Sequence, residues 1–406
     1  MYKTEIKYSF ADYLPLFLVL CFSGNPIFTS TQYAKPLFIL FAVSFILFVL
    51  SRISSKNLNK PIIRLLTIIS CIVVLSVFQK YSLGTVSYPG VIALTLKITI
   101  GLFLMLYYQR KQISVFHLYI NLLTVLTILS LPLFALNFFT YVGVYLPFND
   151  SKTLFFYTSF NAPLDEIRNS GMFWEPGAFA GYLILALLFI ILNNRKFVIG
   201  DFKKQATWLL IGLLTTMSTT GFLVLAIMIF IYVFQNYKYG RVIVLPIVFF
   251  ISIYAYNNLE FLNVKIEEQY SSATEMETGD VSNTRFGSLN MDIQYIMDQP
   301  YTGNGLDNKT RYRFHPWLNE DIGHGNGMSN FLVYWGIPFF LLWVFCTFKF
   351  AFNYSESIGI SIIFTIILLL ALQGEQFLNY PIFLLFFTAP AIPLVRYEDK
   401  ISLDLV

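Results

Sequence analysis

Residues 282–305, SNTRFGSLNMDIQYIMDQPYTGNG, lie within the longest polar stretch of the chain, which runs from Asn257 to Gly327. On both sides of this stretch the sequence consists of apolar runs of about 17 to 22 residues, the length that an α-helix needs to cross a membrane. The stretch therefore predicts one large loop between two sets of membrane-embedded segments. A second, smaller polar stretch extends from Thr140 to Gly177.

The composition places the whole chain in a membrane. Of its 406 residues, 56% are hydrophobic and only 12% are charged, and the mean hydropathy is +0.65. So little polar surface cannot cover a soluble globule of this size. The long apolar runs predict an all-α polytopic bundle, since the strands of a membrane barrel would appear as short alternating segments. The net charge of +4 comes from bases in short loops, which indicates topology, and we expect no nucleic-acid partner.

We expect one membrane domain, residues 1–406, of about twelve helices. The expected spans lie near residues 10–28, 34–51, 62–80, 88–108, 114–138, 176–193, 205–217, 220–236, 242–257, 326–348, 357–373 and 380–396. The turn between the seventh and eighth spans rests on Ser218-Thr219-Thr220-Gly221 alone, and one long helix is the alternative, which would invert everything downstream. The N-terminus shows no small-residue cleavage site and is expected to remain as the first span.

Lysine and arginine predict the orientation. When termini and loops are assigned alternately to the two sides, seventeen basic residues fall on one side and nine on the other. Basic residues collect on the cytoplasmic side, so we expect both termini in the cytoplasm and the polar loops at about 139–175 and 258–325 outside. Lys97 is the only charge clearly inside an expected span. Such a residue either has a functional role or reaches a buried partner or the membrane interface.

The large loop should contain a short helix at the membrane surface. Ser282 or Asn283 can cap it, Arg285 falls in its first turn, and Pro300 ends it. Its apolar residues recur at spacings of three and four and form one stripe: Phe286, Leu289, Ile293 and Ile296.

Arginines are the candidate ligands for an anion. From Asn257 to Ile322 the loop carries eleven acids against five bases, so an anionic ligand would need specific cations to hold it. A guanidinium grips phosphate oxygens with two donors, which makes Arg285, Arg311, Arg313 and, from the smaller loop, Arg168 candidates. Contact with lipid headgroups or pairing with acids is the alternative, and it is the favoured interpretation for Arg311 and Arg313 taken singly.

Two further residue types could take part in chemistry. His324 lies just before a span in a glycine-rich setting and can act as a general base, with a structural role as the alternative and His315 as its rival. Glu175 precedes Pro176 at the start of a span, where the helix dipole favours a carboxylate.

No motif predicts a metal or cofactor site. Zinc-ligand spacing and nucleotide-binding glycine loops are absent, and a metal held by carboxylates alone stays an open alternative. The three cysteines fall in apolar runs and are expected to be buried hydrophobic residues.

The order of these motifs resembles the O-antigen polymerase and O-antigen ligase superfamily. The resemblance covers roughly Arg168 to Pro338, and it departs from the family at Gly325, because the family's histidine is commonly followed directly by Asn or Ser. It is carried by Arg168 with Gly171, Phe173 and Glu175-Pro176-Gly177, by Ser218-Thr219-Thr220-Gly221, by Arg285 ahead of Pro300 and Gly303-Asn304-Gly305, and by His324 and Asn326 leading into Tyr334-Trp335-Gly336.

The resemblance implies an enzyme of GT-C-like architecture in the bacterial inner membrane. Such an enzyme takes a glycan from undecaprenyl pyrophosphate on the outer face and joins it to an acceptor sugar hydroxyl without a metal or other cofactor. By the same resemblance Arg168 and Arg285 would hold the pyrophosphate and His324 would activate the acceptor. Glu175, Arg311, Arg313 and Asn326 complete the set of expected substrate-binding residues.

Polymerase is preferred to ligase because no feature can be tied to a lipid A core acceptor. The expected partners are lipid-linked donor and acceptor, membrane lipid and, for a polymerase, a chain-length regulator. A flippase or other transporter is the alternative from another class, but it should place polar groups inside the bundle, whereas here they lie in two loops. A scaffold would leave the ordered arginine, glutamate and histidine pattern unexplained.

Overall fold

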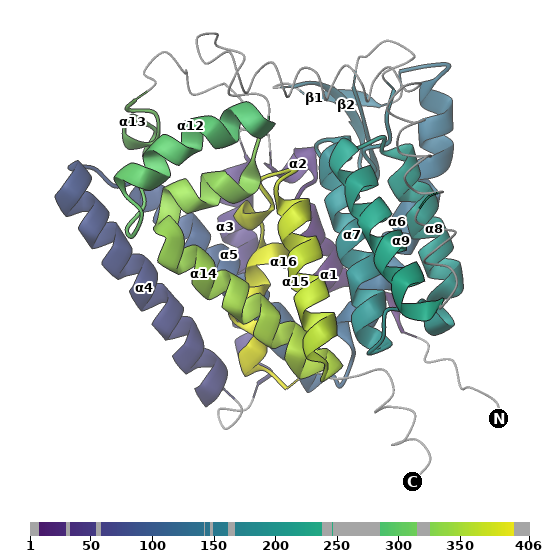
Figure 1. The fold of residues 1–406 in the computed structure, drawn as a ribbon, viewed down its shortest axis with the longest axis horizontal. Coiled ribbons are helices and arrows are strands. Elements are labelled where there is room, and N and C mark those ends of the chain that lie inside the picture. The colour runs from purple at the N-terminus through teal and green to yellow at the C-terminus, as the bar shows by residue number, and fades with distance from the viewer. Residues whose placement is uncertain are drawn as a thin grey trace.

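The protein is a multi-pass helical membrane protein. Six helices of the computed structural model are long and apolar enough to cross a membrane, and they lie together in one bundle (Figure 1). They are α4 (Asn59–Leu83), α5 (Tyr88–Arg110), α6 (Val115–Asn137), α7 (Pro176–Asn193), α9 (Thr219–Asn236) and α14 (Gly327–Ser355). The structure describes residues 8–29, 33–53, 58–141, 143–146, 149–160, 167–237, 246, 285–314 and 325–393.

The expected count of about twelve spans is not reproduced in these ranges. Three more apolar helices, α1 (Phe10–Cys21), α3 (Ala34–Leu50) and α15 (Ile358–Leu372), have 17 residues or fewer. Even the longest of them reaches only about 26 Å at 1.5 Å per residue, against about 30 Å of hydrocarbon. The helix expected at 205–217 is α8 (Lys203–Thr215), with 13 residues. The span expected at 242–257 lies outside the described residues, apart from position 246.

The last expected span, 380–396, is not a continuous helix. It starts as the four-residue α16 (Pro381–Leu384) and continues as the 3-10 turns η6 (Leu385–Phe387) and η7 (Ala389–Ala391). Pro390 and Pro393 lack the backbone N–H that a longer helix would need. The segment is nevertheless almost wholly buried.

The turn expected between the seventh and eighth spans is confirmed. α8 ends at Thr215 and α9 starts at Thr219, and Met217 between them has a φ of 45°, which no helix continues through. The Ser218 hydroxyl caps α9 by accepting the N–H of Gly221 at 3.3 Å. One long helix across this region is therefore excluded.

Helix α14 is bent at Gly336, and the part after the bend is by itself long enough to cross a membrane. Its 29 residues would reach about 43 Å if straight, which exceeds the hydrocarbon by more than 10 Å. Gly336 has a φ of 76°, and a Cβ there would lie 2.6 Å from the carbonyl oxygen of Tyr301. Residues 337–355 then measure about 28 Å, which matches the bilayer.

The polar segment 285–314, called the head below, packs across this bend. It contains α12 (Arg285–Asp298) and the short α13 (Asn308–Arg311), and Figure 1 shows both at one end of the bundle. The backbone N–H of Asn304 donates to the carbonyl of Val333 at 2.6 Å, and that of Ile337 donates to Pro300 at 2.8 Å. The helix expected from Arg285 to Pro300 is present as α12, and Phe286 and Ile293 of its apolar stripe are exposed.

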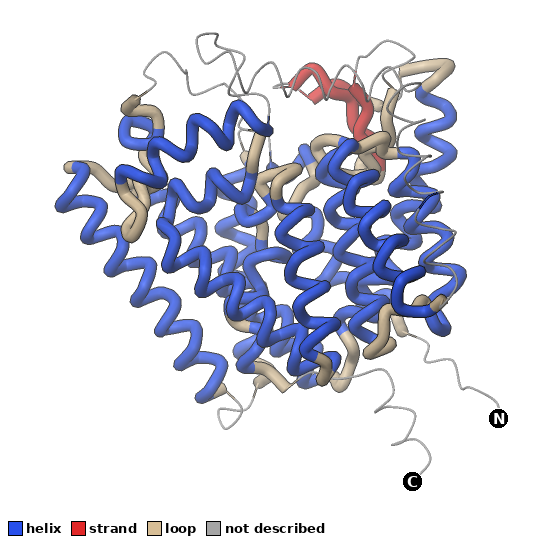
Figure 2. The backbone as a smooth tube through the Cα atoms, viewed as in Figure 1, coloured by secondary structure: helices blue, strands red, loops and turns tan. Residues whose placement is uncertain are grey.

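A three-stranded antiparallel sheet lies at the same end of the bundle (Figure 2). Its strands are β1 (Val144–Leu146), β2 (Asn149–Leu154) and β3 (Tyr157–Phe160), joined in that order. The Asn25 side chain donates to the Phe155 carbonyl at 2.7 Å, which ties the sheet to the turn after α1. The sequence analysis did not predict these strands.

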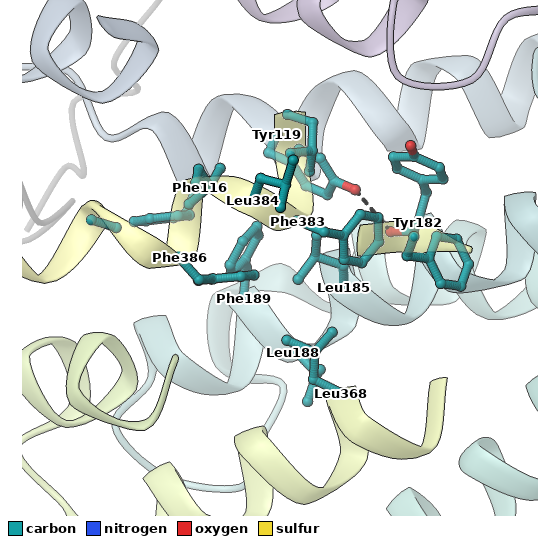
Figure 3. Packing of buried hydrophobic residues seen from close by; sticks show 14 of the residues in the cluster. Phe116, Tyr119, Tyr182, Leu185, Leu188, Phe189, Leu368, Phe383, Leu384 and Phe386 are labelled. Atoms are coloured by element: carbon teal, nitrogen blue, oxygen red, sulfur yellow. Dashed lines mark hydrogen bonds between the residues drawn. The ribbon is translucent and has the colours of Figure 1, made fainter. Parts of the chain in front are cut away.

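Helix α7 lies at the centre of the bundle. Nearly all of its side chains are buried against α6, α8, α9 and α15. Figure 3 shows the packing: the rings of Phe116 and Phe189 lie 4.4 Å apart, and the Tyr119 hydroxyl donates to the Tyr182 carbonyl at 3.1 Å. The start of α7, where Glu175 lies, is therefore firmly positioned.

Candidate functional site

A pair of carboxyl groups joins the start of α7 to the turn after α15. Glu175 is the N-cap of α7, in extended conformation, but its side chain makes no bond to the helix N–H groups. It shares a hydrogen bond with the carboxyl group of Glu375 instead. Burial, and next the Glu175 charge, raise the pKa of Glu375 well above its usual range, which favours the neutral, protonated form of Glu375.

Two arginines approach this pair from other segments. The charges of Arg285 and Arg168 act in the opposite sense and lower the pKa of Glu375, which places both within electrostatic reach of it. Arg285 is the first residue of α12, and its Nη1 donates to Thr219 Oγ1, at the start of α9, at 2.8 Å. The structure thus brings Arg168, Glu175 and Arg285 together and adds Glu375.

The backbone beside Arg168 is fixed by its neighbour. The Asn169 N–H donates to the Thr215 carbonyl at 3.0 Å, and the Asn169 amide donates to Ser130 Oγ at 3.1 Å and Thr215 Oγ1 at 3.0 Å. Asn169 is fully buried. The segment that carries Arg168 is therefore held between α6 and α8.

Three helices start against the turn Gly374-Glu375 with little space for further side chains. A Cβ on Gly327, the first residue of α14, would lie 1.9 Å from the Glu375 carbonyl oxygen. A Cβ on Gly177 in α7 would lie 2.6 Å from Glu375 Oε1, and one on Gly374 would lie 3.2 Å from Thr220 Oγ1 in α9.

This arrangement can hold an anion. The starts of α7, α9 and α14 each present a partial positive charge. Two guanidinium groups lie within electrostatic reach of the carboxyl pair, and the raised pKa of Glu375 favours its neutral form, so the site favours an anion. An anion with two negative charges, such as a diphosphate diester, would complement it.

The sequence motifs do not identify Glu375 as a site residue. It lies in the short turn Gln373-Gly374-Glu375 between two expected spans and belongs to no recognised motif. One signal was present: it is the only charged residue between Glu356 and Arg396. A lone carboxyl group in so apolar a region indicates a polar partner elsewhere in the chain.

Arg311 lies in a buried ion pair, the arrangement that the sequence analysis gives as the alternative to substrate binding. Its side chain and that of Asp292 are both fully buried, and Nη2 lies 2.5 Å from Asp292 Oδ1. Its Nε donates to Asn330 Oδ1 at 3.1 Å, and its guanidinium lies 5.2 Å from the centre of the Tyr295 ring. Arg311 fastens the head to α14 and is not accessible to a ligand.

Arg313 and Asn326, two further expected binding residues, both make contacts within the protein. Arg313 forms a partly exposed ion pair with Asp298 and donates to Asn304 Oδ1 at 3.0 Å. Asn326 is the N-cap of α14, where its Oδ1 accepts the Ser329 N–H at 3.0 Å. His324 and its rival His315 lie outside the described residues.

Lys97 lies within α5 near the same site. Its Nζ is 6.0 Å from the centre of the Phe38 ring and 5.9 Å from that of Tyr380. The Tyr380 ring is 4.8 Å from that of Trp174, the residue before Glu175. Lys97 makes no ion pair with any residue that the structure describes.

The described ranges contain no group of three or more His, Cys, Asp or Glu side chains placed to hold a metal ion. Comparison of the chain with protein-family models, with curated proteins and with solved structures finds no match.

We expect Glu375→Gln to make stability less dependent on pH. Because the folded protein raises the Glu375 pKa, it binds the proton more tightly than the unfolded chain, whose glutamates titrate near about 4.3. Stability should therefore fall as the pH rises from there through the folded-state pKa. Glutamine mimics the protonated form, so thermal unfolding in detergent between pH 5 and pH 8 (roughly one to four units above that value) should show a flatter profile for the variant.

Glu356→Gln is the matched control, because Glu356 is exposed at the other end of the bundle and pairs with Arg195 at 3.5 Å. A profile for Glu375→Gln as steep as that of the parent and of this control would show that Glu375 is ionised in the folded protein.

Proposed function

We propose that the protein is a metal-independent glycosyltransferase that polymerises undecaprenyl-pyrophosphate-linked oligosaccharide units on the outer face of the bacterial inner membrane. One observation supports it above all. Arg168 and Arg285, which the family resemblance assigns to pyrophosphate binding, come from distant segments and meet with Glu175 around Glu375 at one end of the bundle. This is the end that carries the head and the sheet.

The proposed reaction is a displacement at the anomeric carbon of the donor sugar. The bond from this carbon to the phosphate oxygen breaks, and a bond to the acceptor hydroxyl oxygen forms. The acceptor proton passes to a base, for which His324 remains the candidate, and the diphosphate leaves on its lipid. Arg168 and Arg285 stabilise the charge that develops on the leaving group, and their fixed positions orient it.

The carboxyl pair has a supporting role in this proposal. Glu175 and Glu375 keep the two guanidinium groups in place while the donor is absent. Because the raised pKa of Glu375 favours its neutral form, the pair does so at a smaller repulsive cost to an incoming diphosphate than two carboxylates would impose.

The orientation is part of the proposal. The distribution of lysine and arginine puts the end of the bundle with the candidate site on the outer face and both termini in the cytoplasm. An impermeant thiol reagent on intact spheroplasts should label a single cysteine placed at position 150 and spare one placed at 200 or 238. The reverse pattern would contradict the orientation.

Reconstitution tests the activity. The purified protein in liposomes is given undecaprenyl-pyrophosphate repeat units, and we expect longer lipid-linked glycans to accumulate. A parallel sample also receives lipid A core, because transfer to that acceptor alone would identify a ligase. Recovery of unchanged donor in both samples, with stable protein, would contradict the proposal.

A further inference from the structure

A basic cavity lies at the end of the bundle opposite the candidate site. It measures about 400 Å³ and opens where α3 and α5 end side by side. Its walls are Val49, Arg52, Ile53, Tyr107, Arg110 and Lys111. The other end of α5 is near the head, since a Cβ on Gly90 would lie 2.9 Å from Leu306 Cδ1, so this cavity is separate from the carboxyl pair.

The cavity has an excess of positive charge. Lys111 Nζ pairs with Asp12 Oδ1 at 2.7 Å. The Arg52 guanidinium lies 4.2 Å from the centre of the Phe48 ring, and neither Arg52 nor Arg110 pairs with a carboxylate among the residues that the structure describes. Three cations thus face one carboxylate.

Helix dipoles do not account for this arrangement by themselves. The C-terminal ends of α3 and α5 carry a partial negative charge, which accounts for basic residues at positions 52 and 110. It does not explain why three basic side chains converge on one cavity, whose volume falls within the range of about 300–1,000 Å³ seen for small-molecule sites.

We propose that this cavity binds the headgroup phosphate of an anionic glycerophospholipid. The ends of membrane-spanning helices lie at the level of the headgroups, where basic pockets between helices attract anionic lipid. Arg52 and Arg110 can grip phosphate oxygens with two donors each. Beside the cavity the Phe48 ring lies against Arg52 and near the ring of Tyr107 and is 39% exposed, which offers an apolar surface for an acyl chain.

Lipid titration tests the charge requirement. The whole protein in phosphatidylcholine nanodiscs is titrated with phosphatidylglycerol, and bound lipid is measured by native mass spectrometry. Each basic residue at a membrane surface contributes about fivefold in affinity, so Arg52→Gln with Arg110→Gln should weaken binding about twenty-five-fold. Arg195→Gln is the control, because Arg195 lies at the same end but is paired with Glu356. If Arg195→Gln lost as much phosphatidylglycerol affinity as the double variant, the effect would come from general surface charge, and the proposed lipid site would be wrong.

A second variant tests the cavity itself. Ile53→Trp fills the space and leaves every charge in place, so it should weaken phosphatidylglycerol binding as strongly as the double arginine variant. Thermal unfolding in pure phosphatidylcholine checks its folding. Unchanged lipid binding in Ile53→Trp would exclude the cavity, and competition by inorganic phosphate as effective as that by lipid would show that a soluble ion is the ligand.

Discussion

Arg311→Met should lower the free energy of unfolding by about 3–5 kcal/mol, the usual cost of removing one partner from a buried ion pair. Asp292 is fully buried, and without the guanidinium its charge loses its ion-pair partner, while the Ser329 hydroxyl still donates to Oδ2 at 2.6 Å. The loss should also free the head from α14, because Arg311 Nε no longer bonds Asn330. Thermal and denaturant unfolding in detergent measure the effect.

Two comparisons make this prediction specific. Arg313→Met removes a partly exposed pair with Asp298 and should cost no more than about 1 kcal/mol. Adding Asp292→Leu to Arg311→Met removes the unpaired charge and should restore most of the stability. If Arg311→Met were as stable as Arg313→Met, Arg311 would have to be hydrated, and it would return to the list of ligand-binding candidates.

Arg168→Lys and Arg285→Lys should each lower glycan transfer about ten- to a hundredfold. Lysine keeps the charge but loses the planar pair of donors that matches phosphate oxygens, and one charge-assisted hydrogen bond is worth about 1.5–3 kcal/mol. For Arg285 the loss includes its bond to Thr219, which fixes the guanidinium against α9. Transfer by the reconstituted variants is compared with that of the parent at equal protein amounts.

Arg313→Lys is the matched control, since Arg313 is an arginine of the head that pairs with Asp298 at the surface. It should transfer glycan at nearly the parental rate. Thr219→Val should have an intermediate effect, because it leaves the Arg285 guanidinium intact and removes only its anchor. Parental activity in both Arg168→Lys and Arg285→Lys would remove them from the site and with them the main support for the proposed function.

The sequence predicts the features that local pattern controls. Apolar runs identify the helices, and the hydroxyl of Ser218 marks the start of α9 because capping depends only on neighbouring residues. The helix at Arg285 follows from the spacing of its apolar residues and the proline that ends it. Arg168, Glu175 and Arg285 were found by their order along the chain rather than by any sign that they meet.

Features that depend on distant contacts could not be predicted. Hydropathy cannot show that Gly336 breaks α14, because the break is stabilised by Tyr301 and Gly303 from the head. The burial of Arg311 depends on Asp292 and Asn330 on two other elements, so the sequence indicates that it can pair with an acid but not which acid, or that the pair is buried. The raised pKa of Glu375 likewise depends in part on Glu175, which lies about 200 residues earlier in the sequence, at the start of α7.

The break in α14 has a consequence for how the protein responds to its bilayer. A straight helix can slide along its axis when the lipid acyl chains lengthen, but here the packing of Gly336 against Tyr301 fixes the point at which the span begins. Hydrophobic mismatch must then be absorbed by tilt of residues 337–355 or by local deformation of the lipid. In the proposed function this fixed point would hold the carboxyl pair and its arginines near the headgroups, the depth at which a diphosphate on a membrane-anchored tail is presented.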